Sequence, residues 1–141
     1  MAHGNLQDSA RELAGKLVDV VDREDFDTLA GLVPRLIGRQ APEHSLLRPL
    51  LGELLTVLAH LVRARSSEIS PGDVFSVELT DDVEVDELPP PLRATLRAVL
   101  AELNDDHDNA RLHLDFIAAD PNPLGRLDAL VHLVTWVHGL R

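Results

Sequence analysis

The stretch "EHSLLRPLLGELLTVLAHLVRAR", residues 43–65, is the strongest helix candidate in the sequence. Its apolar residues recur at intervals that place them on one broad arc of a helix, while Arg48, Glu53 and His60 fall on the opposite face. Pro49 fits this helix only if the helix begins close before it, with Ser45 as the N-cap. The apolar arc consists of Leu47, Leu50, Leu51, Leu54, Leu55, Val57, Leu58, Leu61 and Val62.

Two helices are predicted before this stretch. The spacing of apolar residues predicts one amphipathic helix over residues 6–23 and a second helix that ends at Gly38. Asp25 or Asp27 is suited to cap the second helix at its start. Pro34 removes one backbone hydrogen bond, so a kink or an early end of that helix is expected. Its predicted inner face consists of Phe26, Leu29, Leu32, Val33, Leu36 and Ile37.

Three helices are predicted after it. The fourth follows the stiff run Pro89–Pro91 and ends near Asn104, the fifth spans about residues 106–119, and the sixth spans about residues 124–139. The sixth helix is apolar over most of its circumference, and we therefore expect it to be the most buried of them.

Residues 66–91 form an acidic, proline-containing connection with eight acidic residues and no Lys or Arg. Phe75, Val77 and Leu79 alternate with polar residues, which predicts a short extended or β-hairpin excursion near residues 73–86. One interpretation is a solvated linker. The other is an arm that recruits a basic partner, with Phe75, Val77 and Leu79 making apolar contacts while the carboxylates steer the approach.

These patterns predict one all-α domain over residues 1–141, an antiparallel bundle of five or six helices with that one excursion. The hydrophobic content is 45% but the aromatic content only 3%, so aliphatic side chains must form the core. The absence of cysteine excludes disulfides, thiol catalysis and Cys-ligated metal centres.

The net charge of -11 disfavours binding to nucleic acid and to anionic lipid. The N-terminus lacks the pattern of a signal peptide, and no continuous apolar run reaches the length of a membrane span, which predicts a soluble, cytoplasmic protein. Twelve of the 13 basic residues are Arg, which suggests a GC-rich, bacterial genome.

The stretch "NDDHDNARLHLDF", residues 104–116, raises the question of a metal site. Successive side chains on a helix point about 100° apart, so adjacent residues do not converge on one ion. Asp and Asn at a helix start satisfy free N–H groups and face the positive end of the dipole. The stretch is therefore interpreted as the cap of the fifth helix.

His113 falls within the apolar arc of the fifth helix, so it is predicted to point toward the core or a pocket. Asp128 and His132 are four residues apart on the sixth helix, where a carboxylate can orient and charge an imidazole. If His113 faces them, the three side chains form a candidate metal site or proton-transfer site. The alternatives are a hydrogen-bonded core histidine and a polar stripe exposed to solvent.

The sequence contains no complete catalytic motif and predicts no cofactor. The leading hypothesis is a non-catalytic protein–protein interaction module, such as an adaptor, a regulator or a small chaperone, with a basic protein or a second copy as partner. The alternative is a helical protein, or an enzyme, that binds a metal or small ligand through His113, Asp128 and His132.

Overall fold

The computed structural model describes residues 5–38, 40–41, 44–65 and 88–141. The prediction of an all-helical chain is confirmed, since the described residues form six α-helices and one short 3-10 helix, with no strand among them. The extended or β-hairpin excursion near residues 73–86 lies outside the described residues. The helices are α1 (Asn5–Asp22), α2 (Phe26–Ile37), η1 (His44–Leu46), α3 (Leu47–Arg65), α4 (Pro90–Leu103), α5 (His107–Ala118) and α6 (Pro123–Leu140).

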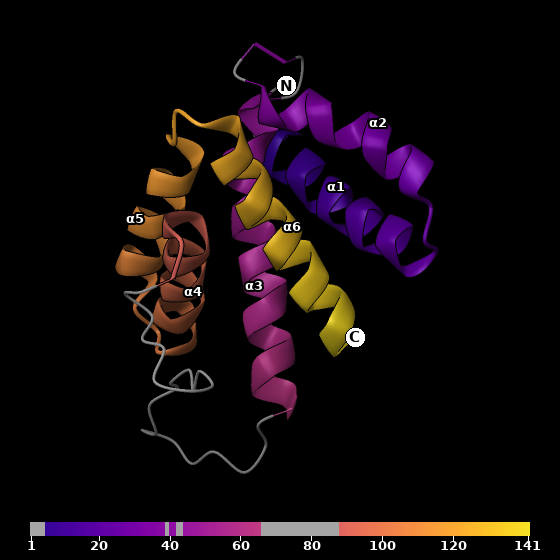
Figure 1. Cartoon of the computed structure of the whole chain (residues 1–141). Coiled ribbons are helices and arrows are strands. Elements are labelled where there is room, and N and C mark those ends of the chain that lie inside the picture. Colours follow the sequence, from indigo (N-terminus) through magenta and orange to yellow (C-terminus); the bar gives the residue numbers. More distant parts are fainter. Residues whose placement is uncertain (1–4, 39, 42–43, 66–87) are drawn as a thin grey trace.

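The helices are arranged around α3 and α6. Figure 1 shows the α4–α5 pair on one side of α3 and the α1–α2 pair on the other, with α6 lying along α3 between the two pairs. The α4–α5 pair makes the most extensive contact between any two helices, and α6 contacts every other α-helix. This arrangement places two helical hairpins against a two-helix centre.

The core is built from the aliphatic face of α3. Leu50 and Leu51 are fully buried, and the helix packs against α1, α4, α5 and α6. Contrary to the expectation from counting apolar runs, the segment His44–Arg65 is long and apolar enough to cross a membrane by length and composition alone. Core helices pass the same criteria, and in this structure the apolar face of α3 is covered by other helices of the chain. Val57, predicted within the buried arc, is 40% exposed.

The turns between α1 and α2 and between α4 and α5 have the same local structure. In each turn a non-glycine residue adopts the left-handed conformation, Glu24 at φ 56° and Asp105 at φ 60°. The following aspartate, Asp25 or Asp106, is the N-cap of the next helix, and its carboxylate accepts a hydrogen bond from the backbone N–H three residues on. The interpretation of residues 104–116 as a helix cap is therefore confirmed. The hydrogen bonds that Thr28 donates from its hydroxyl and its backbone N–H also lower the pKa of Asp25.

Glu24→Gly is expected to raise the free energy of unfolding by about 0.5–1 kcal/mol. The left-handed conformation costs a residue with a Cβ roughly 1–2 kcal/mol, and the greater chain entropy of unfolded glycine offsets about half of that. Urea denaturation followed by circular dichroism measures the change. Arg23→Gly is the control, because the φ of Arg23 is not positive and the substitution also removes its ion pair with Asp19. An equal gain in both variants would contradict the explanation.

The end of α2 differs from its prediction in two ways. The helix continues through Pro34 to Ile37 without ending early. Gly38 is extended, with φ -70° and ψ 136°, so the helix is not closed by a left-handed glycine. Instead, the last carbonyls are bonded by side chains from elsewhere: Arg126 Nε donates to the Ile37 carbonyl at 2.9 Å, and His44 Nδ1 lies 3.0 Å from the Leu36 carbonyl.

Candidate functional site

The structure does not gather His113, Asp128 and His132 into a metal site. Among the residues that the structure describes, no group of three or more His, Asp or Glu side chains is placed to hold a metal ion. Asp128 is exposed on α6, as expected for a polar stripe that faces solvent. No hydrogen bond or ion pair joins Asp128 to His132 in this part of the chain. The imidazole of His132 instead stacks on Trp136, with ring centroids 5.4 Å apart and planes at 19°.

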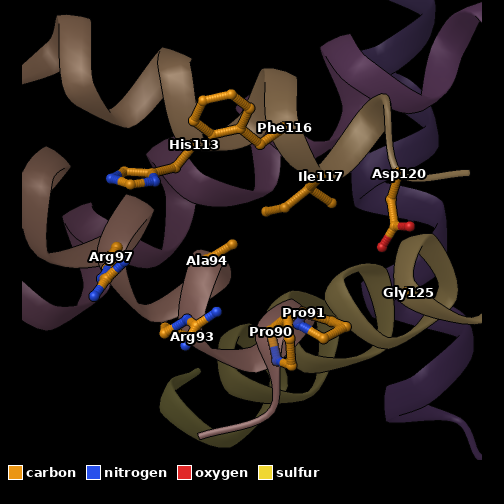
Figure 2. A pocket seen from close by; sticks show the side chains of 10 residues that line it. All are labelled: Pro90, Pro91, Arg93, Ala94, Arg97, His113, Phe116, Ile117, Asp120 and Gly125. Carbon is orange, nitrogen blue, oxygen red and sulfur yellow. The ribbon is translucent and has the colours of Figure 1, made fainter. Parts of the chain in front are cut away.

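His113 lines a pocket of about 270 Å³, which we call the His113 pocket. Figure 2 shows it between α4 and α5, with the start of α6 at one end. Arg93 and Arg97 reach it from α4, and Phe116 and Ile117 form an apolar wall on α5. The rings of His113 and Phe116 meet edge to face with centroids 6.3 Å apart. His113 was predicted to point toward the core or toward a pocket, and the structure confirms the pocket.

Two effects act on the charge of His113. Burial lowers the pKa of His113 from its ordinary value of 6.5, and the positive charge of Arg97 lowers it further. The imidazole is therefore neutral at pH 7 and has an N–H that can donate a hydrogen bond. A metal ion bound to His113 would be repelled by Arg97. Sequence reasoning did not single out Arg93 and Arg97, although their spacing of four places both on one face of α4.

Among the described residues that line the His113 pocket, Asp120 is the one with an acidic side chain. Its carboxylate accepts a hydrogen bond from the backbone N–H of Asn122 at 2.9 Å and packs against Gly125 in the first turn of α6. A Cβ at Gly125 would collide with that carboxylate, so glycine permits this close approach. Figure 2 places Asp120 away from Arg97 and His113, near Gly125 at the start of α6.

An apolar groove of about 210 Å³ lies where α1 and α2 meet α6. We call it the α2–α6 groove and define it by Phe26, Leu29, Val33, Leu130, Val131 and Thr135. The prediction that Phe26 belongs to the inner face of its helix is wrong, since 62% of this side chain is exposed. On the α6 side of the groove, Val131 is 47% exposed. Two exposed apolar side chains, one from α2 and one from α6, thus line the same groove.

A second apolar groove adjoins the first at Thr135, which lines both. It lies between α3, α4 and α6, has a volume of about 400 Å³, and includes Trp136, the single tryptophan. The outer surface of α6 is therefore flanked by apolar grooves on both sides.

A polar cleft of about 290 Å³ separates α3 from α5, and its charged groups are largely paired. Arg48 Nε donates to the Asp115 carboxylate at 2.7 Å, and His107 Nδ1 lies 3.0 Å from Glu102. Glu53, expected on a solvated face, is only 14% exposed in its side chain and accepts a hydrogen bond from Gln7 on α1. These groups join helices, and the balance of acids and bases gives the cleft no preference for an anion or a cation.

Phe75, Val77 and Leu79, the predicted partner-binding residues, lie outside the described residues, and their role stays a prediction. Comparisons with protein-family models, with curated proteins and with solved structures find no match to this chain.

Proposed function

We propose that this chain is a non-catalytic protein-interaction module that binds a basic, amphipathic helix in its α2–α6 groove. The observation that carries the proposal is the pair of exposed apolar side chains, Phe26 on α2 at 62% and Val131 on α6 at 47%, that both line one apolar groove. Amphipathic helices commonly bind in such grooves by inserting side chains spaced three and four residues apart.

The composition of α6 supports this use of the groove. A helix that is apolar on most of its circumference is normally buried on most sides. Here the inner side of α6 is covered by the other helices, whereas Leu124 and Val131 on its outer side are 63% and 47% exposed. A bound helix from a partner would cover the apolar surface at Val131 and Phe26.

The charges around Phe26 favour a basic partner. The segment "DREDFD", residues 22–27, contains four acidic residues and one basic residue. Glu24, Asp25 and Asp27 are exposed, whereas the Asp22 carboxylate is paired with Arg141 and His138. Asp128 adds an exposed carboxylate on α6, three residues before Val131. These carboxylates would steer a Lys- or Arg-rich helix toward the groove. A second copy of the chain is a weaker candidate, because each copy carries a formal charge of -11.

Val131→Asp is expected to weaken binding of a helical leucine–lysine peptide at least tenfold. The substitution places a carboxylate within the apolar contact, where burial of an unpaired charge costs well over 1.4 kcal/mol. Fluorescence anisotropy of the labelled peptide measures the affinity. Two further peptides separate the contributions: an alanine–lysine peptide keeps the charge without the apolar face, and a leucine–glutamate peptide keeps the apolar face with the opposite charge.

Leu112→Asp is the matched control, because Leu112 is 46% exposed on α5 and does not line the α2–α6 groove. Leu112→Asp changes the net charge by the same amount as Val131→Asp. The affinity for the leucine–lysine peptide is expected to stay within about twofold of the parent value, as is usual for a substitution outside an interface. Equal loss in both variants, or equal binding of the alanine–lysine peptide, would overturn the proposal. A dimer in sedimentation that is lost in Val131→Asp would instead assign the groove to a second copy.

A further inference from the structure

We propose that this chain forms a homodimer with two-fold symmetry, in which the α1 helices of two copies pack antiparallel and cross at Gly15. The contact lies over a groove of about 530 Å³ between α1, α3 and α6, which we call the Gly15 groove. This groove shares no lining residue with the α2–α6 groove. The dimer is therefore independent of the proposed binding of a basic helix, and either interaction can fail without the other.

Gly15 leaves open space at the centre of the proposed contact. It lies in the interior of α1, where glycine is less favourable than alanine. A Cβ at this position would meet no neighbouring atom of the described chain within 4 Å, so packing within one copy does not require glycine. Val57, which is 40% exposed, lines the same groove from α3. A helix of a second copy can approach the backbone closely at Gly15 and cover Val57.

The charges on either side of Gly15 are complementary to themselves under a two-fold rotation. Arg11 lies four residues before Gly15 and Asp19 lies four residues after it, and all three line the groove. Residues four apart form one row along a helix. When this row meets a second copy of itself in the antiparallel direction, Arg11 of each copy faces the partner's Asp19. A two-fold interface repeats every contact, so two intermolecular ion pairs form.

The charged side chains that line the Gly15 groove are balanced, although the whole chain has a net charge of -11. Among the described residues, the groove is lined by two arginines and two acids, Arg11, Arg141, Asp19 and Glu53. Two copies that meet here therefore avoid the repulsion that they would meet at the exposed carboxylates beside the α2–α6 groove.

The intermolecular ion pairs do not require Arg11 or Asp19 to be unpaired within one copy. Arg11 lies 3.7 Å from Glu53, and Asp19 lies 3.2 Å from Arg23. The side chains of Arg11 and Asp19 nevertheless remain 68% and 51% exposed. A guanidinium group has five N–H donors and a carboxylate has two acceptor oxygens, so each can bind a second partner.

Sedimentation equilibrium of the full chain at physiological ionic strength tests the dimer. We expect a monomer–dimer equilibrium, and a chain that stays monomeric up to about 1 mM would overturn the proposal. Arg11→Asp is expected to weaken the dimer at least about tenfold, because both intermolecular attractions become repulsions between carboxylates. Asp19→Arg is expected to weaken it as much by placing guanidinium groups against each other.

The double variant Arg11→Asp/Asp19→Arg tests whether residue 11 faces residue 19. It restores opposite charges across the two-fold axis at an unchanged net charge, so its dimer is expected to return to within about threefold of the parent affinity. A mixture of the two single variants should form mixed dimers for the same reason. A double variant that stays as weak as the single variants would overturn the antiparallel contact.

Asp108 and Arg111 provide the matched control for charge, because they form an exposed ion pair on α5 outside the groove. Arg111→Asp and Asp108→Arg change the net charge by the same amounts and are expected to leave the dimer affinity within about twofold. Equal weakening in these variants would mean that association responds only to net charge, against the proposal. A dimer lost in Val131→Asp but kept in Arg11→Asp would place the contact at the α2–α6 groove instead.

Gly15→Gln tests the close approach of the two helices. The added side chain brings no charge and is expected to weaken the dimer at least about tenfold by holding the helices apart. Gly31→Gln is the control, because a Cβ at Gly31 in α2 also meets no neighbouring atom and Gly31 does not line the groove. Glutamine is a better helix former than glycine, so both variants should fold. Unchanged association in Gly15→Gln would contradict a crossing at Gly15.

Discussion

Leu51→Ala is expected to lower the free energy of unfolding by about 2–5 kcal/mol and the melting midpoint by roughly 10 °C. Leu51 is fully buried on α3, and α3 packs against α1, α4, α5 and α6. The substitution removes the transfer free energy of the two lost methyl groups and the methine group, and it leaves a cavity. Because helices on several sides hold the surrounding side chains in place, the cavity is expected to close only in part.

Denaturation followed by the fluorescence of Trp136, checked against far-ultraviolet circular dichroism, measures this change. Val57→Ala on the same helix is the control. Val57 is 40% exposed, and alanine has the higher helix propensity, so we expect a change within about 0.5 kcal/mol. A loss of less than 1 kcal/mol in Leu51→Ala would contradict the central position of this leucine in the core.

Helix positions followed well from the sequence because apolar period, caps and chain breaks all indicated the same boundaries. The fifth helix was predicted over about residues 106–119 and is found at His107–Ala118, with Asp106 as its cap. In both hairpin turns an aspartate cap directly follows a residue in the left-handed conformation. These are local interactions, and local sequence is sufficient to predict them.

The exposure of individual apolar residues could not be predicted from the sequence pattern. The helical pattern assigns Phe26 to the inner face of α2, but that helix lies at the edge of the molecule and packs against α1 and part of α6. Its apolar face is therefore wider than the surface that covers it, and Phe26 stays exposed. A helical pattern gives the direction of a side chain, whereas exposure depends on which helix lies opposite.

The candidate sites show the same distinction. His113 could be assigned to a pocket because its direction on α5 depends only on the helix. His113 lines the same pocket as Arg93 and Arg97 because α4 packs against α5. His113 does not form a metal site with Asp128 and His132 because of where α6 lies. Long-range packing was the information that the sequence pattern lacked.

For Arg126, the helical pattern of the sequence alone was enough to predict a buried arginine. It precedes Leu130 by four residues and Leu133 by seven, so it falls on the buried face of α6. An arginine on such a face is expected to bond buried polar groups. In the structure it is 2% exposed and donates hydrogen bonds to the carbonyls of Ile37, at the end of α2, and of Asp120, before α6.

Arg126→Met is expected to lower the free energy of unfolding by about 2–4 kcal/mol. Each hydrogen bond from a charged group contributes about 1.5–3 kcal/mol, and the removal of a buried charge offsets part of the loss of two such bonds. The Ile37 carbonyl, which the extended Gly38 leaves without a left-handed cap, would lose its donor. We therefore expect the amides of α2 to lose hydrogen-exchange protection before those of the α4–α5 pair, because α2 makes few other contacts.

Two further variants separate the charge of Arg126 from its geometry. Arg126→Lys keeps the charge, but one ammonium group cannot reproduce a guanidinium that bonds two carbonyls in different directions, so it should be at least as destabilising as Arg126→Met. Arg111→Met, on the exposed surface of α5, should change stability by no more than about 0.5 kcal/mol. If Arg126→Lys is as stable as the parent while Arg126→Met is less stable, a positive charge at this position is sufficient to hold the end of α2. If both match the parent, the two carbonyl bonds only compensate the cost of burying the guanidinium, and α2 is held by its apolar contacts.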